Sequence, residues 1–132
     1  MATESERIHR YHEDELGECR VADVVTRLSE LDMLQNSARS DRVESDLAVL
    51  STLGNETRYR LARVLSDADG ELCVCELNAV VDVTESAISH ALSDLHEAGL
   101  VTRRKDGRWR KYEATPVADA IIDSLDEVHA DE

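Results

Sequence analysis

Apolar residues recur at helical spacing from residue 21 onward, and this pattern predicts an accessory helix. The polar stretch over residues 35–41 then predicts a linker. Residues 1–18 alternate charged residues and histidines without apolar periodicity, which is typical of a mobile arm. We therefore expect residues 1–42 to form an N-terminal arm and accessory helix. The apolar positions of this helix are Val21, Val24, Val25, Leu28, Leu31 and Leu34.

The main domain is expected over residues 43–132, and it begins with three helices. The first covers residues 43–53 and stops at Gly54, a residue suited to a left-handed helix end. Asn55 is expected to cap the second helix, which ends around residues 67–70. A short third helix is predicted from about Cys73 to Val80.

A tight turn over residues 81–83 precedes a fourth helix, which starts at Thr84 and ends at Gly99. Strands over residues 100–105 and 108–114 flank Asp106-Gly107, a dipeptide favoured in two-residue hairpin turns. Thr115 and Pro116 then cap a last helix with one apolar stripe. This order predicts a mainly α-helical winged helix-turn-helix with a β-hairpin wing, and leaves the first and last helices of the domain for dimerisation. The apolar residues of the fourth helix are Ile88, Ala91, Leu92 and Leu95, and those of the last are Val117, Ile121, Leu125 and Val128.

Length and composition fit a protein of one domain plus an arm. The 132 residues contain no apolar run of membrane-spanning length, and residues 1–14 are polar and charged. Three cysteines, Cys19, Cys73 and Cys75, make an odd number, and the last two are too close for an ordinary disulfide. We therefore expect a cytoplasmic protein with no disulfide framework.

The net charge of −14 argues on average against DNA as a partner. Its distribution changes that conclusion, because residues 71–102 and residues 114–132 each carry six acids and no Lys or Arg, whereas residues 103–112 carry six bases and one acid. Such a basic island is the distribution that matters for nucleic-acid recognition. The acidic remainder resembles, in composition, proteins from salt-loving organisms.

The fourth helix and the hairpin supply the candidate contacts to double-stranded operator DNA. In a winged helix the helix after the tight turn enters the major groove, and the wing lies against the backbone or the minor groove. The alternative is that the wing bases only pair with the acidic surface of their own subunit. The candidate DNA-binding residues are Thr84, Ser86, Ser89, His90 and Ser93 on the helix, and Arg103, Arg104, Lys105, Arg108, Arg110 and Lys111 on the wing.

Cys73 and Cys75 form the candidate effector site. Two thiolates two residues apart can bind one soft ion, and such ligands select copper(I), zinc, cadmium, lead or trivalent arsenic over hard cations. In a regular helix residues i and i+2 point about 200° apart, so both sulfurs would reach one ion only if the first turn loosened. The alternative is that both are small buried core residues.

Several motifs closely resemble those of the ArsR/SmtB family of metal-sensing repressors. The segment ELCVCEL at residues 71–77 is similar to the family's ELCVCDL box, and LGNETR at 53–58, SHALSDL at 89–95, AGLV at 98–101 and GRWRKY at 107–112 also match its pattern. The resemblance implies a homodimeric repressor that leaves its operator when the thiols bind arsenite or antimonite, favoured here over cadmium, lead or zinc. No further cofactor is required.

One departure from the family concerns the third ligand. Arsenical repressors of the best-known type carry a third Cys where this chain has Asn78. In the cadmium- and lead-sensing branch, thiols of an N-terminal arm complete the site, and Cys19, with His9 and His12 nearby, lies in such an arm. The resemblance therefore makes Cys19 the candidate third ligand.

Three alternatives to the metal-responsive repressor differ in class. A redox or sulfur sensor could use the same Cys pair without metal. A protein-interaction module would fit the acidic surface and a recognition helix without Lys or Arg. An enzyme is not expected, because Ser89, His90 and Asp94 follow one helix and no phosphate loop is present.

Overall fold

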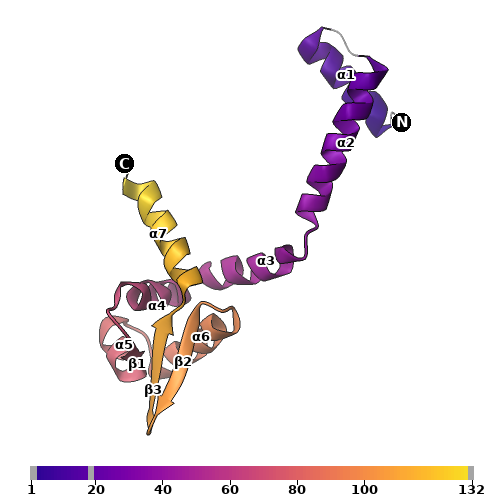
Figure 1. Ribbon diagram of the computed structural model, residues 1–132. Coiled ribbons are helices and arrows are strands. Elements are labelled where there is room, and N and C mark those ends of the chain that lie inside the picture. The colour runs from indigo at the N-terminus through magenta and orange to yellow at the C-terminus, as the bar shows by residue number, and fades with distance from the viewer. Residues whose placement is uncertain (1–2, 18–19, 131–132) are drawn as a thin grey trace. The chain divides into compact units, whose positions relative to one another are not determined.

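The computed structural model describes residues 3–17 and 20–130 (Figure 1). The chain divides into two compact units, Met1–Val43 and Glu44–Glu132. No helix in the described part is long and apolar enough to cross a membrane. In chain order the elements are α1 (Glu4–Leu16), α2 (Val21–Ala38), α3 (Arg42–Leu53), α4 (Glu56–Asp67), β1 (Leu72–Cys73), α5 (Val74–Val80), α6 (Glu85–Glu97), β2 (Val101–Asp106), β3 (Trp109–Ala114) and α7 (Pro116–Ala130).

The first unit is a pair of helices, and the prediction of an arm without structure over residues 1–18 is wrong for Glu4–Leu16. A capping box starts α1: Thr3 Oγ1 accepts from the Glu6 N–H at 3.1 Å, and the Glu6 carboxylate accepts from the Thr3 N–H at 3.3 Å. α1 also packs against α2, and Ile8 lines a hollow together with Leu28 and Leu31. The apolar residues of α1 that lie beside α2, such as Ile8 and Leu16, are too few to show a helical period in the sequence.

The predicted linker over residues 35–41 is also partly helical, because α2 extends to Ala38. The stretch over residues 35–38 contains no Gly or Pro, so its polar side chains can continue a helix that is already formed. Only residues 39–41 remain between α2 and α3.

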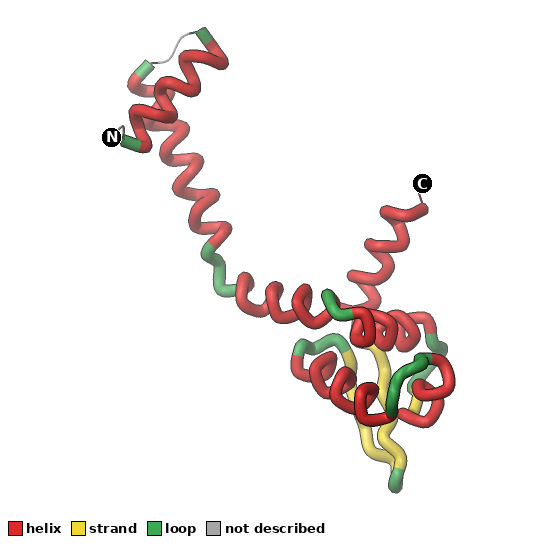
Figure 2. The backbone as a smooth tube through the Cα atoms, turned by 180° about the vertical axis from the view of Figure 1, so that it is seen from behind, coloured by secondary structure: helices red, strands yellow, loops and turns green. Residues whose placement is uncertain are grey.

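The second unit confirms the predicted mainly helical class with a β-hairpin, which projects beyond the helices (Figure 2). Asn55 caps α4 as expected, since its Oδ1 accepts from the Arg58 N–H at 3.1 Å. Every predicted apolar position of α6 is buried. The fully buried core side chains come from α4, α5, α6, the start of the hairpin and α7, and the largest are Leu61, Leu65, Leu77, Ile88, Leu92, Leu95, Leu100, Val101 and Ile122.

The sheet has three antiparallel strands in the order β1-β3-β2. The short strand β1 was not predicted, and α5 begins at Val74 rather than at Cys73. The pairing that forms β1 is with β3, far along the chain, so it leaves no local pattern. The hairpin turn also differs by one residue, because Asp106 pairs with Trp109 and Gly107 and Arg108 are the turn residues. Gly107 has φ 61°, which suits glycine at the first turn position.

Helix α7 begins at the predicted cap and packs on α4. Thr115 Oγ1 accepts from the Ala118 N–H at 3.3 Å and donates to the Gly99 carbonyl at 2.8 Å, which ties the helix start to the end of α6. Two polar contacts then join α7 to α4: Ser66 to Asp119 at 2.7 Å and Arg63 to Asp126 at 2.7 Å.

Candidate functional site

Helix α6 presents its predicted DNA-reading side chains to solvent. Thr84 is the N-cap, and its Oγ1 accepts from the Ala87 N–H at 3.1 Å, so this hydroxyl holds the helix start. The buried apolar stripe of α6 faces the core, which leaves the polar residues outside. The exposed candidates are Thr84, Ser86, Ser89, His90 and Ser93.

Five of the six bases of the wing divide between its two faces, and the sixth, Arg108, lies in the hairpin turn. In an antiparallel sheet, side chains of directly opposite residues share a face. Arg104 lies opposite Lys111, and both share a face with Asp106. On this paired face the Asp106 carboxylate lies 3.1 Å from Lys111 Nζ and 4.0 Å from Arg104 Nη1. The hydrogen bond from Lys111 lowers the pKa of Asp106.

Glu71, just before β1, completes the paired face. Its carboxylate accepts from Arg104 Nε at 3.0 Å and from Nη2 at 2.8 Å. This contact lowers the pKa of Glu71 and raises that of Arg104. The alternative in which wing bases pair with acids of their own subunit therefore describes Arg104 and Lys111.

The opposite, free face carries Arg103, Lys105 and Arg110. None of the three forms an ion pair within the described part of the chain. Lys105 lies directly opposite Arg110, and like charges in this position repel each other. Together with Arg104, the three line a hollow of about 250 Å³. An anionic partner such as a phosphate backbone would relieve the repulsion.

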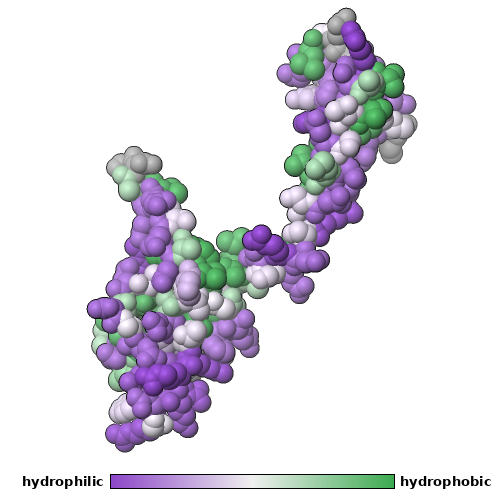
Figure 3. All heavy atoms as spheres, in the orientation of Figure 1, coloured by the Kyte–Doolittle hydropathy of each residue, from purple (hydrophilic) through white to green (hydrophobic). Residues whose placement is uncertain are grey.

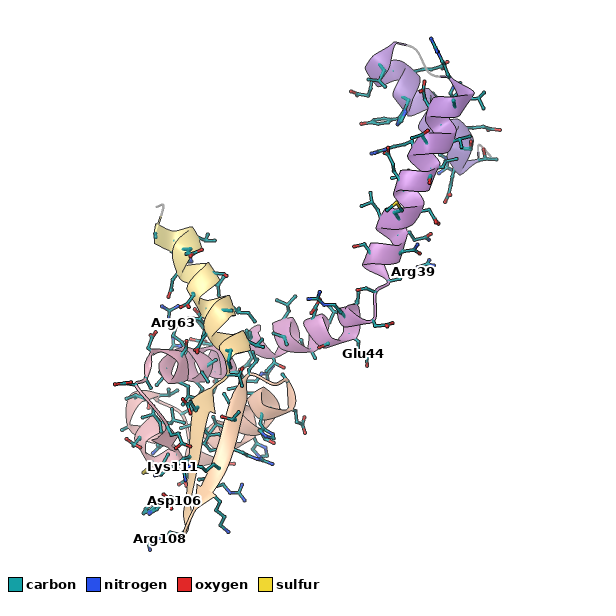
Figure 4. All side chains as sticks on the ribbon, viewed as in Figure 1. Arg39, Glu44, Arg63, Asp106, Arg108 and Lys111 are labelled. Carbon is teal, nitrogen blue, oxygen red and sulfur yellow. A yellow bond between two sulfur atoms is a disulfide. The ribbon has the colours of Figure 1, made fainter. Side chains whose placement is uncertain are left out.

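Arg108 and Trp109 form the tip of the wing. The Arg108 guanidinium lies 4.9 Å from the centre of the Trp109 ring, a cation–π contact, and Trp109 is 48% exposed. Figure 4 shows Arg108 at the end of the hairpin, with Asp106 and Lys111 farther along it. The tip therefore offers a cation held by an aromatic ring.

Cys73 and Cys75 are joined by a disulfide, and the expectation that they are too close for one is wrong. Their Cα atoms lie 5.4 Å apart, within the range of ordinary disulfides. The reason is that Cys73 ends a strand with extended backbone and caps α5, while Cys75 lies in its first turn. Cys73 is half-buried and Cys75 exposed, so neither is a fully buried core residue.

The same geometry corrects the expectation that α5 must loosen before both sulfurs reach one ion. That expectation holds for two helical residues, but only Cys75 is within α5. The strand-to-helix boundary brings the sulfurs together in the folded chain. The Cys73 N–H donates to the Glu76 carboxylate at 3.1 Å, which stabilises this boundary.

The cysteine pair opens on a groove of about 380 Å³ that it shares with the candidate DNA-binding elements. Cysteines of the β1–α5 boundary form one part of the wall, the first turns of α6 a second part and the wing tip a third. The groove thus brings together side chains that the sequence placed in two separate sites. Its lining residues are Cys73, Val74, Cys75, Glu85, Ser89, Arg108, Trp109 and Arg110.

The predicted third ligand, Cys19, lies outside the described residues. His9 and His12 are on α1 in the first unit, where His9 Nε2 lies 3.8 Å from a Glu13 carboxylate oxygen. Over residues 3–17 and 20–130, no group of three His, Cys, Asp or Glu side chains is placed to hold a metal ion. The described residues therefore supply two sulfur donors.

Sequence reasoning missed two residues that position the site. Glu71 was seen only as part of the cysteine box, and its contact with Arg104 depends on a long-range strand pairing. Arg58 donates from Nε to the Thr52 carbonyl at 2.8 Å and lies 3.4 Å from Asp94 on α6. Arg58 therefore fixes the α3–α4 corner to α6. Its place in the LGNETR motif was the feature of the sequence that could have identified it.

Comparison with known proteins agrees with this geometry. The family described as "Bacterial regulatory protein, arsR family" matches residues 55–103. A Halobacterium salinarum protein that carries the name of an arsenical resistance operon repressor, ArsR, is 53% identical over 121 residues, 92% of this chain and 94% of the relative. Two solved structures share the fold. One, titled "Crystal structure of Possible transcriptional regulator for arsenical resistance", has a TM-score of 0.50 and 41% identity over 65% of this chain and 97% of its own. The other is reduced HlyU from Vibrio cholerae, with a TM-score of 0.58 and 30% identity. The match covers 74% of this chain and 95% of the HlyU chain.

These similarities confirm the winged-helix fold and the resemblance drawn from the motifs. They favour a DNA-binding regulator over a protein-interaction module, and the family is one of regulators rather than enzymes. The coverage of the Halobacterium relative extends over both units. The chain therefore belongs to the ArsR family of DNA-binding transcriptional repressors.

Proposed function

We propose that this chain is a repressor whose affinity for operator DNA falls when Cys73 and Cys75 bind a soft metal ion or metalloid. Arsenite or antimonite is favoured over cadmium, lead or zinc. The observation that carries the proposal is the groove shared by the two cysteines, Ser89 and the wing residues Arg108 and Arg110. Relatives named for arsenical resistance support the choice of metalloid.

The two sulfur atoms fit such an effector once they are reduced. Thiolates are the donors that soft ions and trivalent metalloids prefer, and the bound group would supply strong bonds to both sulfurs. The chain's own contribution is to hold the donors together at the β1–α5 boundary and to open them onto the groove. Occupancy of this groove would compete with contacts from Ser89, Arg108 and Arg110 to DNA.

Anisotropy of a labelled duplex from the region upstream of its own gene tests the proposal. The reduced protein is bound to the duplex and titrated with arsenite, antimonite, cadmium, lead and zinc. We expect release by the two metalloids at the lowest concentrations, and no release for Cys73→Ser with Cys75→Ser. A double variant that arsenite releases as readily as the wild type would contradict the proposal.

We also propose Cys19 as the third sulfur donor, which the absence of a Cys at position 78 requires for a three-coordinate site. Arsenite affinity and stoichiometry are measured on reduced Cys19→Ser. Weaker binding at the same stoichiometry is expected if Cys19 is a ligand. Unchanged affinity excludes this role and leaves Cys73 and Cys75 as the complete protein donor set.

We further propose that the repressor is a homodimer formed through α3 and α7. Both helices expose large apolar residues, including Leu50 at 61% and Val128 at 65%, and Figure 3 shows apolar surface on α3 and near the start of α7. Light scattering of Leu125→Glu with Val128→Glu should give a monomer. Glu127→Gln, on another side of α7, is the matched control and should remain dimeric.

The disulfide favours one second candidate function, a redox response through the same cysteines. Two thiols would lose two electrons and two protons to a peroxide, which leaves as two water molecules. Peroxide without metal should then change operator affinity, and a reducing agent should restore it. If peroxide oxidises the pair and operator affinity stays constant, this candidate is excluded while the metalloid proposal stands.

A further inference from the structure

The cysteine pair is connected to the wing through one row of the sheet. Cys73 on β1 lies opposite Lys111 on β3, and Lys111 lies opposite Arg104 on β2. Directly opposite residues in antiparallel strands place their side chains on one face. Cys73 therefore begins a row that crosses the whole sheet and ends on the outer strand of the wing.

A chain of ionic contacts follows the same face. Glu71, two residues before Cys73, holds the Arg104 guanidinium with two oxygens, and Arg104 and Lys111 both approach Asp106 at the hairpin turn. The strand β2 is thus tied to the cysteine-bearing segment twice, by the ladder through β3 and directly by Glu71. Arrangements in which one charge serves two partners resist the displacement of any single member.

We propose that Glu71 and Arg104 are positioning residues that transmit the occupancy of the cysteine pair to the wing. The inference rests on the proposed function and specifies how the effector site acts on DNA binding. A change in the backbone at Cys73 displaces Glu71 and Lys111 together, because one is two residues away and the other is its ladder partner. The ion pairs pass this displacement to β2 and to the turn at Asp106.

The free bases lie on the other face of the same two strands. Arg103 and Lys105 are the chain neighbours of Arg104, and Arg110 is the neighbour of Lys111. Any rotation or shift of β2 and β3 that the paired face imposes therefore reorients the residues predicted to bind phosphates. The wing needs no separate contact with the effector to respond to it.

The test measures the ratio of operator dissociation constants with and without arsenite, on the reduced full chain and a duplex from upstream of its own gene. Glu71→Gln keeps the size of the side chain and removes its charge. We expect this variant to lower the ratio by about fivefold, which is the upper range for an exposed pair of good geometry. The arsenite affinity of the DNA-free protein should stay within about twofold of wild type. Glu97→Gln, an exposed acid on α6 away from the wing, should keep the wild-type ratio.

A charge exchange separates coupling from a merely structural role. Glu71→Arg with Arg104→Glu should recover most of the wild-type ratio, because the pair is restored with its charges reversed. A structural role would lower stability in all states and leave the ratio unchanged. A wild-type ratio in Glu71→Gln overturns this inference. If arsenite fails to release the wild-type protein, the proposed function itself is overturned.

Discussion

The two faces of the wing carry the same kinds of basic side chain in opposite electrostatic settings. On the paired face, Arg104 and Lys111 are held by Glu71 and Asp106. On the free face, Arg103, Lys105 and Arg110 have no ion pair within the described residues, and two of them repel each other across the strands. The comparison teaches that six bases in ten residues are not one site. One face is built to hold the wing, and the other is left available to phosphate.

The largest effect on operator affinity is expected when the bases of the free face are replaced. Replacing Arg103, Lys105 and Arg110 by Gln removes three candidate phosphate contacts per subunit. Operator affinity should fall by roughly a hundredfold or more at 0.1 M salt, and the slope of log affinity against log salt should decrease by about 2.7 for each subunit that contacts DNA. Anisotropy over a salt series measures both. A salt slope equal to that of the wild type would show that these bases do not contact DNA.

A smaller effect is expected from the paired face. Glu71→Gln with Arg104→Gln removes one ion pair and leaves the net charge unchanged. Operator affinity of the effector-free protein should change by less than about threefold, since an exposed pair contributes little and its charge is already balanced. The salt slope should stay at the wild-type value. A loss as large as that of the free-face variant would place Arg104 on the DNA and remove the distinction between the faces.

The smallest effect concerns acid stability. Arg104 and Lys111 hold the pKa values of Glu71 and Asp106 below their ordinary range in the folded chain. Such an ion pair contributes its full stabilisation at a pH above the ordinary carboxylate pKa of the unfolded chain. The contribution is lost as the pH falls from there through the lower pKa of the folded chain. Between about pH 5 and pH 3 the free energy of unfolding should fall less steeply in Glu71→Gln with Arg104→Gln than in the wild type. Arg103→Gln, on the free face, should show the wild-type pH dependence in denaturant titrations.

The local pattern of apolar and capping residues was enough to predict most of the helices and the hairpin. The apolar residues of α6 repeat at the helical period, and Asn55, Thr84 and Thr115 cap the helices that they were expected to cap. These features depend on residues within one or two turns of each other. Apart from the end of α2, the start of α5 and the position of the hairpin turn, the exception is α1, whose capping box with Thr3 was present in the sequence but whose apolar face depends on α2.

The arrangement of the site depended on pairings that no local pattern reveals. Whether Cys73 belongs to a strand or to a helix is decided by its partner Lys111, and that choice determines whether the two sulfurs meet. The same pairing places Arg104 within reach of Glu71. The sequence predicted roles for the cysteines and for the wing, while their shared groove and the division of the bases could be seen only in the fold.

Thermodynamic linkage gives the most direct test of the central claim that the cysteine pair controls DNA binding. Arsenite affinity is measured by calorimetry on the reduced protein, free and saturated with the duplex from upstream of its own gene. The account predicts that DNA weakens arsenite binding by the same factor by which arsenite weakens DNA binding. Equal arsenite affinity in the free and the DNA-bound protein would contradict it.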